Sequence, residues 1–214
     1  MNGDRWASFD CYGTLIDWNA GIRGALSDVF GEDRADGVLA RYHELEPEIE
    51  HDGSLSYREV MTEAMRRLGA PEERASALAD SLPSWEPFPE VPAVLAELRQ
   101  RGWSLAILSN SDPPQIEASK AKLGVPFDVT VVAGEIRSYK PAHRHFEEFR
   151  ARSGVARERH VHVGASLFHD AAPARELGIP FVWINRLGET SDLPVRELPD
   201  LGRLPLTLDD LVPA

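Results

Sequence analysis

Short runs of apolar residues recur along the chain, and each run ends in small or polar residues. The runs span residues 6–9, 103–108, 129–132, 160–163 and 181–184. Their length, and the lack of alternation with polar residues, are typical of parallel strands that are buried on both faces. We therefore expect these segments to be the strands of one sheet.

Between these runs, the apolar residues recur at the spacing of amphipathic helices. The helical stretches cover residues 91–101, 114–123, 143–153 and 171–177. A glycine follows each stretch closely, as is common where helices end, namely Gly102, Gly124, Gly154 and Gly178. Strands that alternate with helices in this way predict an α/β fold, with a doubly wound parallel sheet.

The interval from residue 17 to residue 85 breaks this alternation, because it shows no strand pattern. Residues 20–30, 34–50 and 56–68 carry helical spacing, and residues 71–81 are a candidate fourth helix. The proline-rich residues 83–89 then predict a linker back into the sheet. We therefore expect two domains: a core formed by residues 1–16 and 86–214, and a helical cap formed by residues 17–85. Within the core, residues 193–214 are predicted to be loop.

Length and charge narrow the classes of function. A chain of 214 residues suits a core domain with a smaller insert. With 35 acidic and 23 basic residues, the formal net charge is −12. Such a chain repels phosphate backbones, so we expect no nucleic-acid partner. The single cysteine, Cys11, excludes an intrachain disulfide, and the sequence shows neither a signal-peptide pattern nor an apolar run that could span a membrane. These features predict a cytoplasmic protein without membrane association.

Polar residues that could carry chemistry follow the predicted strands. Asp10 follows the first strand, the run Ser109-Asn110-Ser111-Asp112 follows the second, and Asp170 lies shortly after the fourth. Ligands of open α/β sheets bind at the carboxyl ends of the strands, which makes these residues site candidates. Each also has a structural interpretation, because Asp and Ser commonly cap turns and helices. Lys140, which precedes a proline, could equally be a solvated loop residue.

The order of these residues is more informative than any one of them. Asp10, then Ser109, then Lys140, then Gly164-x-Ser166-x-x-x-Asp170 resembles the four-motif signature of the haloacid dehalogenase superfamily. The resemblance covers nearly the whole chain, including a helical cap after the first motif. It implies a hydrolase in which Asp10 is a covalent nucleophile.

Most members of this superfamily are phosphatases, in which a second aspartate two positions after the nucleophile protonates the leaving alkoxide. This chain has Tyr12 at that position, and a phenol with a pKa of about 10 is a poor acid at neutral pH. A halide is a weak base and leaves without a proton. Ala165 stands where the phosphatases usually have a carboxylate that helps to bind magnesium. The resemblance therefore implies carbon–halogen chemistry without a metal or another cofactor.

Three segments resemble the type II L-2-haloacid dehalogenases in particular: residues 10–17, the cap residues 38–46 that include Arg41, and residues 106–110 with 183–186. The resemblance implies catalytic roles for Asp10, Arg41, Lys140 and Asp170. It implies substrate contacts for Cys11, Tyr12, Thr14, Tyr42, Leu45, Ser109, Asn110 and Ser166. The chain departs from the usual fourth motif at Ala165, Leu167 and His169.

The function expected from these observations is hydrolysis of small (S)-2-haloalkanoic acids to (R)-2-hydroxy acids through an aspartyl ester. Two alternatives stay open: a phosphatase for a small phosphate ester, and a drifted member that binds a small molecule without turnover. The expected partner is a small 2-haloacid. The related dehalogenases are commonly homodimers, which leaves a homodimer open here, although the sequence shows no decisive apolar patch.

Overall fold

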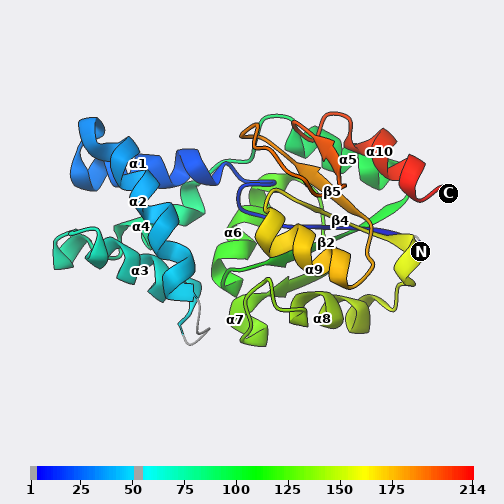
Figure 1. The fold of residues 1–214 in the computed structure, drawn as a ribbon, viewed down its shortest axis with the longest axis horizontal. Coiled ribbons are helices and arrows are strands. Elements are labelled where there is room, and N and C mark those ends of the chain that lie inside the picture. Colours follow the sequence, from blue (N-terminus) through cyan, green and yellow to red (C-terminus); the bar gives the residue numbers. More distant parts are fainter. Residues whose placement is uncertain (1–3, 51–54) are drawn as a thin grey trace.

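The computed structural model describes residues 4–50 and 55–214, and these contain a six-stranded parallel sheet in the order β3-β2-β1-β4-β5-β6 (Figure 1). The strands are β1 (Arg5–Phe9), β2 (Trp103–Ser109), β3 (Val129–Val132), β4 (His160–Gly164), β5 (Phe181–Ile184) and β6 (Arg196–Leu198). The five predicted strands and the doubly wound α/β fold are confirmed. The prediction of a loop over residues 193–214 is wrong, because this segment contains β6 and helix α10 (Leu204–Leu211).

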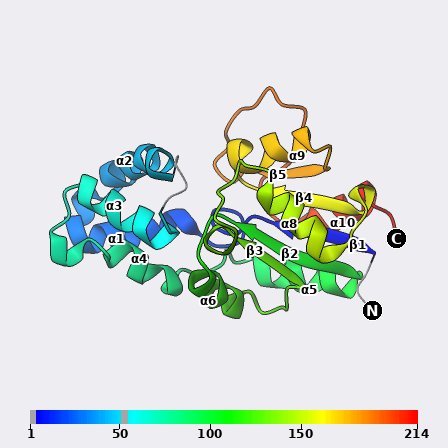
Figure 2. The same ribbon diagram turned by 90° about the horizontal axis from the view of Figure 1, so that it is seen from below.

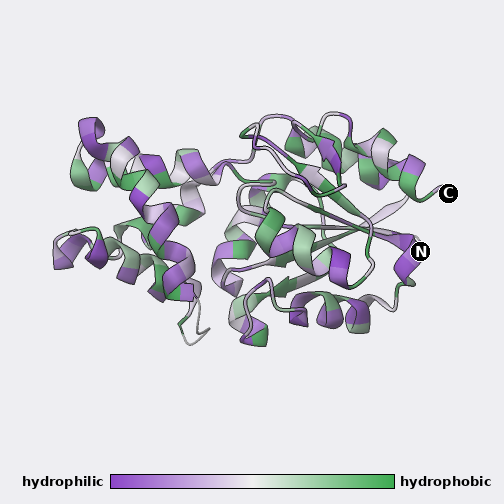
Figure 3. Ribbon diagram, viewed as in Figure 1, coloured by the Kyte–Doolittle hydropathy of each residue, from purple (hydrophilic) through white to green (hydrophobic). Residues whose placement is uncertain are grey.

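Helices cover both faces of the sheet (Figure 2). Helices α5 (Val91–Gln100), α6 (Pro113–Leu123) and α10 pack on one face, and α8 (Arg144–Ser153) and α9 (Ala172–Glu176) pack on the other. The short helix α7 (Ala133–Ile136) follows β3. Alternate strand residues serve the two cores, as Trp6 and Ala7 of β1 illustrate. Apolar residues concentrate in the strands, and hydrophilic residues on the outer helices (Figure 3).

The register of β1 decides where its carboxyl end lies. Phe9, the last residue of β1, pairs with Ile107 of β2 and with Val163 of β4. The backbone N–H of Asp10 then donates to the carbonyl of Val163 at 2.9 Å. The chain segments that follow three neighbouring strands therefore meet at one edge of the sheet.

The described residues between β1 and α5 contain helices and no strand, as predicted. It contains α1 (Trp18–Phe30), α2 (Glu32–Glu50), α3 (Tyr57–Arg67) and α4 (Ala77–Ser81), which we call the cap segment. These helices form a group at the end of the sheet where the site lies (Figures 1 and 2). Asp17 caps α1, and Ser56 with Glu59 forms a capping box at the start of α3.

The chain enters and leaves the cap segment at one place. The N–H of Asp17 donates to the carbonyl of Glu86 at 2.9 Å, and the N–H of Phe88 donates to the carbonyl of Leu15 at 3.0 Å. Ile16 and Pro87 form an antiparallel bridge between these connections. The geometry agrees with boundaries near residues 16 and 86, while the division into two domains stays a prediction. Within the described residues, no helix has the length and apolar character to cross a membrane.

Candidate active site

Asp10 lies directly after the central strand and is held at both carboxylate oxygens. Its Oδ1 accepts a hydrogen bond from Nζ of Lys140 at 2.9 Å, and its Oδ2 accepts one from the hydroxyl of Thr14 at 2.8 Å. The side chain is 14% exposed, so a ligand in the adjoining cavity can reach it. Burial is the main influence on the pKa of Asp10 and raises it, although Lys140 and Thr14 act in the opposite direction.

The turn after Asp10 brings Thr14 back beneath the carboxylate. Gly13 takes a φ of 89°, a conformation that favours glycine. The Thr14 hydroxyl donates to Asp10 and accepts from the N–H of Ala165 at 2.9 Å. Thr14 is fully buried and does not contribute to the cavity lining, so it contacts Asp10 and not the expected substrate. The side chain of Cys11 is also buried in the core, and burial raises the pKa of its thiol.

Lys140 connects two carboxylates. Its Nζ lies 2.9 Å from Asp10 and 2.7 Å from Oδ1 of Asp170, and its side chain is 1% exposed. Burial acts to lower the pKa of Lys140, but the two carboxylates outweigh it and raise the pKa above its ordinary value. Burial acts to raise the pKa of Asp170, and Lys140 together with His162 holds it below its ordinary value. Lys140 is thus an ammonium at neutral pH, and of the two acids Asp170 ionises more readily.

The residues after β2 hold the Lys140 loop. The side-chain amide of Asn110 donates to the carbonyl of Lys140 at 3.0 Å and accepts from its N–H at 2.6 Å. The Ser109 hydroxyl accepts from Ser111 at 3.0 Å. The helix-cap interpretation also applies in this region, because Asp112 and Gln115 form a capping box at the start of α6. Capping and site roles therefore coexist in one run of residues.

Asp170 is fixed by the backbone as well as by Lys140. The N–H of Ser166 donates to its Oδ2 at 3.3 Å, and the Ser166 hydroxyl accepts from the N–H of His169 at 3.0 Å. The carboxylate lies so close to Gly164 that a β-carbon there would come within 2.4 Å of Oδ2. Glycine at this position is therefore needed to admit the carboxylate.

A cavity of about 700 Å³ lies above Asp10, between the sheet edge and the cap segment. This volume is ordinary for a small-molecule site. The predicted residues that line it are Asp10, Tyr12, Ser109, Asn110, Lys140, Ser166 and Asp170. The cap segment contributes Trp18, Asn19, His43, Glu46, Pro47, Glu50 and Tyr57.

The structure does not bring Arg41 to this cavity. Arg41 is exposed and forms an ion pair with Glu44 on the outer surface of α2. The phase of the helix is the reason, because the cavity face of α2 carries His43, Glu46 and Glu50, and residue 41 falls on nearly the opposite side. The structure therefore does not bring Arg41 together with the other residues expected to be catalytic.

Tyr42 and Leu45 also lie outside the cavity lining. Both are buried in the apolar interior of the cap segment, on a third face of α2. The Tyr42 hydroxyl donates to Glu46 at 2.8 Å. The structure therefore does not place them in the wall of the cavity, and they pack beneath the helix that carries the lining residues.

Two carboxyl groups of α2, which the sequence reasoning missed, border the cavity. Oε1 of Glu46 accepts hydrogen bonds from the hydroxyls of Tyr42 and Tyr57, each at 2.8 Å. Burial and the neighbouring Glu46 raise the pKa of Glu50 to about 9. The cavity face of α2 follows helical spacing, with residues at positions 43, 46, 47 and 50. The helical period of the sequence could therefore have predicted that these residues share one face.

Two further side chains in the wall each carry a polar atom without a hydrogen-bond partner in the described part of the chain. Nε1 of Trp18 and Oδ1 of Asn19 are buried, and no hydrogen-bond partner exists for them among the described residues. Both side chains border the cavity. Because buried polar atoms are normally satisfied, a donor and an acceptor are free here for a ligand or for water.

Tyr12 lies where a leaving-group acid would be sought. Its hydroxyl lies 3.0 Å from that of Ser119 on α6, and its ring stacks on Tyr57 with centroids 6.4 Å apart. Burial raises the pKa of Tyr12 well above its ordinary value. Tyr12 is therefore a neutral wall of the cavity at physiological pH.

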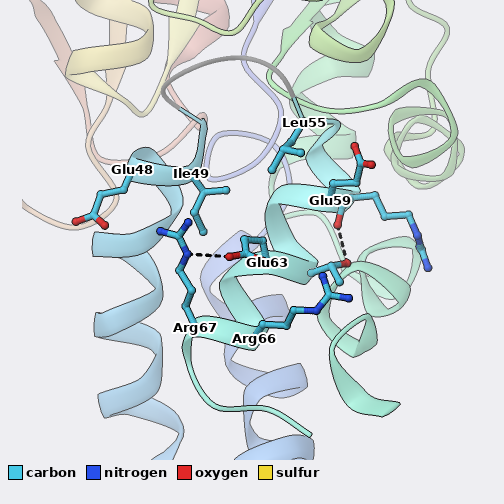
Figure 4. Close-up of a pocket in the computed structure, with 9 residues that line it drawn as sticks. Glu48, Ile49, Leu55, Glu59, Glu63, Arg66 and Arg67 are labelled. Carbon is cyan, nitrogen blue, oxygen red and sulfur yellow. Dashed lines mark hydrogen bonds and ion pairs between the residues drawn. The ribbon is translucent and has the colours of Figure 1, made fainter. Parts of the chain in front are cut away.

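A second cavity, of about 790 Å³, lies on the cap segment between α2 and α3 (Figure 4). Two of the arginines drawn there are held in ion pairs: Arg67 with Glu63 at 3.0 Å, and Arg66 with Glu72, which lies outside the cavity lining, at 2.6 Å. Within residues 4–50 and 55–214, no three His, Cys, Asp or Glu side chains form a group that could hold a metal ion. The reactive groups gather in the cavity above Asp10.

Comparison with known proteins identifies the family of this chain. Residues 5–178 match the family of haloacid dehalogenase-like hydrolases. The chain is 32% identical to an (S)-2-haloacid dehalogenase of Pseudomonas sp. (strain YL), over 89% of this chain and 90% of the relative. It is also 32% identical to a phosphoserine phosphatase of Thermus thermophilus, over 75% of this chain and 67% of the relative. The fold matches an L-2-haloacid dehalogenase structure from Xanthobacter autotrophicus with a TM-score of 0.82, at 20% identity and covering 95% and 98% of the two chains.

The chain therefore belongs to the haloacid dehalogenase-like hydrolase family, and it is a hydrolase.

Proposed function

We propose that this hydrolase converts small (S)-2-haloalkanoic acids into (R)-2-hydroxy acids through an ester on Asp10. The observation that carries the proposal is the pairing of a buried, partly accessible Asp10 carboxylate with a neutral Tyr12 at the position where a leaving-group acid would be needed. A halide departs without a proton, whereas an alkoxide does not. The 32% identity to an (S)-2-haloacid dehalogenase supports the same chemistry.

In the first step, the Asp10 carboxylate attacks the carbon that bears the halogen. A carbon–oxygen bond forms, the carbon–halogen bond breaks, and the halide leaves with the bonding electron pair. Lys140 counters the charge of Asp10 and Asp170 and keeps the nucleophile ionised. Attack from the side opposite the halide inverts the configuration at carbon.

In the second step, water attacks the carbonyl carbon of the Asp10 ester. Asp170, held by Lys140, orients this water and accepts a proton from it. The bond between the aspartyl carbonyl carbon and the ester oxygen breaks, and Asp170 returns its proton to the departing oxygen, which leaves as the hydroxyl of the 2-hydroxy acid. The Asp10 carboxylic acid then loses its proton to water, which restores the carboxylate. The inverted configuration is kept, because this attack does not touch the substrate carbon.

The substrate carboxylate is assigned to the sheet edge and not to the cap segment. Tyr12, Ser109 and Asn110 line the cavity with Asp10 on this side. In this proposal the backbone around residues 11 and 12 and Ser109 bind the carboxylate, and Asn110 receives the departing halide. The cap segment closes the other side with Trp18, Tyr57 and the α2 carboxyls. Exclusion of bulk water by this cover raises the reactivity of the carboxylate.

The first test is halide release from each enantiomer of 2-chloropropionate by the purified protein, with EDTA present. Chloride from the S enantiomer alone, with R-lactate as the product, is the expected result. Chloride from the R enantiomer at an equal rate would contradict the stereochemical assignment, and no chloride from this or other 2-haloacids would overturn the proposal.

The phosphoserine phosphatase relative, at 32% identity, favours a second candidate function: hydrolysis of a small phosphate ester. The same protein is therefore assayed for phosphate release from phosphoserine with magnesium present. Magnesium-dependent phosphate release without halide release would select this alternative.

A further inference from the structure

A series of buried, hydrogen-bonded side chains lies behind the site. Its first members, Ser8, His160 and His162, have no part in the steps proposed above. Ser8 of β1 faces two histidines of the neighbouring strand β4. Its Oγ lies 2.6 Å from Nε2 of His160 and 2.8 Å from Nδ1 of His162. All three side chains are buried in the sheet, where polar groups are costly unless they are satisfied.

The series of hydrogen bonds continues from His162 to Asp10. Nε2 of His162 lies 3.2 Å from Oδ1 of Asp170, which lies 2.7 Å from Nζ of Lys140. The same Nζ lies 2.9 Å from Asp10. An unbroken series of hydrogen bonds therefore links the interior of the sheet to the reacting carboxylate.

The orientation of the His162 ring is fixed at both nitrogens. The Asp170 carboxylate only accepts hydrogen bonds, so Nε2 of His162 carries the proton on that side. Nδ1 is engaged by Ser8. The ring also packs edge-on against Phe146, with centroids 4.9 Å apart and an interplanar angle of 78°. The imidazole has no freedom to turn away from Asp170.

We propose that His162, oriented by Ser8, is a positioning residue that holds Asp170 for the hydrolysis of the Asp10 ester. This inference rests on the proposed function, because Asp170 has its task in the second step of that reaction. His162 touches neither substrate nor Asp10 and acts through Asp170.

The proposal predicts that the two half-reactions respond differently to loss of the hydrogen bond. In His162→Phe an aromatic ring remains against Phe146, but no donor reaches Asp170. Ester formation continues, and ester hydrolysis slows by roughly 10- to 100-fold, the scale expected when a reacting group is misplaced by about 1 Å. The catalytic constant kcat and KM then fall together, while kcat/KM, which reports the first step, stays within about twofold of wild type.

Rapid-quench measurement of chloride from (S)-2-chloropropionate tests this prediction. The expected result for His162→Phe is a burst of one chloride per protein, and an intact mass that shows the accumulated ester. His162→Gln retains an N–H that can reach Asp170, so it should restore most of the turnover. Loss of kcat/KM without ester accumulation would instead show a merely structural role and overturn the proposal.

A measurement without substrate separates this inference from the proposed function. Imidazole nitrogen NMR of the wild-type protein should show His162 protonated at Nε2, and Asp170→Asn should shift that resonance. An unprotonated Nε2, or a resonance that Asp170→Asn leaves unchanged, would overturn the positioning role. Absence of turnover by the wild type on any 2-haloacid would overturn the proposed function, while this spectrum would still decide the contact.

Discussion

The ammonium nitrogen of Lys140 lies 2.9 Å from the carboxylate of Asp10, and neither side chain is more than 14% exposed. A buried ion pair of this kind is sensitive to the loss of one partner, since the remaining charge is neither solvated nor balanced. Removal of the Lys140 ammonium would leave two unbalanced carboxylates, because Asp170 pairs with the same ammonium as Asp10.

Lys140→Met should therefore lower both stability and activity. We expect a loss of about 3–5 kcal/mol in the free energy of unfolding, the range found when one partner of a buried pair is removed. The pKa of Asp10 should rise further without the ammonium, so that less of it is ionised at neutral pH. Urea unfolding and halide release measure the two effects.

Lys120→Met is the matched control, because Lys120 pairs with Glu117 on the outer surface of α6. Such surface pairs contribute about 0–1 kcal/mol. Equal stability losses in the two variants would contradict the buried arrangement around Lys140.

Asp10→Asn should abolish turnover while it preserves the fold. The amide is close in shape to the carboxylate and can still accept a hydrogen bond from Thr14, but it is not a nucleophile. Halide release should fall by roughly 10⁴-fold or more. Circular dichroism and the melting temperature check the fold, and halide release at the wild-type rate would rule out the covalent mechanism.

The activity should decline on the acid side at a pH above 3.8, the ordinary pKa of an aspartate. Burial raises the pKa of Asp10, so the nucleophile becomes protonated, and inactive, at a higher pH than an exposed aspartate would. Because the Thr14 hydroxyl acts to lower this pKa, Thr14→Val should move the acid limb of kcat/KM to still higher pH. A pH–rate profile of both proteins provides the measurement, and an acid limb that shifts downward would contradict the contact.

Glu50 should affect binding in alkaline solution. Its pKa is raised to about 9, so it is neutral at pH 7 and becomes an anion as the pH passes that value. A new negative charge beside the cavity repels a carboxylate substrate, and KM should therefore rise above about pH 9. In Glu50→Gln this rise should be absent. An identical alkaline dependence of KM in both proteins would show that Glu50 does not face the bound substrate.

Arg41→Ala should have little effect on catalysis. Arg41 pairs with Glu44 on the exposed face of α2, and surface substitutions of this kind generally change stability by less than about 0.5 kcal/mol. We expect kcat/KM for (S)-2-chloropropionate within about threefold of wild type, the size of a change of ~0.7 kcal/mol. A loss of 100-fold or more would mean that Arg41 turns into the cavity when substrate binds.

The sheet and most helices were predictable because their signal is local. Each buried strand is a short apolar run, and each amphipathic helix repeats its apolar positions. The strand β6 escaped this reasoning, since Arg196–Leu198 has three residues at the sheet edge and two of them are exposed. Helix α10 begins next to Pro205, which suits a first helical turn, but it lies in the segment 193–214 that was predicted to be loop.

The site was predictable where its residues follow strands. Asp10, Ser109, Lys140 and Asp170 meet because the carboxyl ends of parallel strands share an edge, which the order of motifs already implied. The cap residues depend on how far α2 is rotated about its axis. The position of Arg41 in the sequence suggested that it faces the site. The rotation of α2 about its axis instead directs Glu46 to the cavity and Arg41 to the outer surface.

The paired connections at Ile16 and Pro87 make the cap segment an insertion in the topological sense. Two backbone hydrogen bonds join the chain on either side of it, so a tight turn from Ile16 to Pro87 would close the core without moving a strand. Asp10, Lys140 and Asp170 all belong to that core. A different helical segment grafted between these two residues would lie over the same reacting groups. It would line the cavity with different side chains. The residues proposed to react and the cap wall of the cavity are therefore separable parts of this chain.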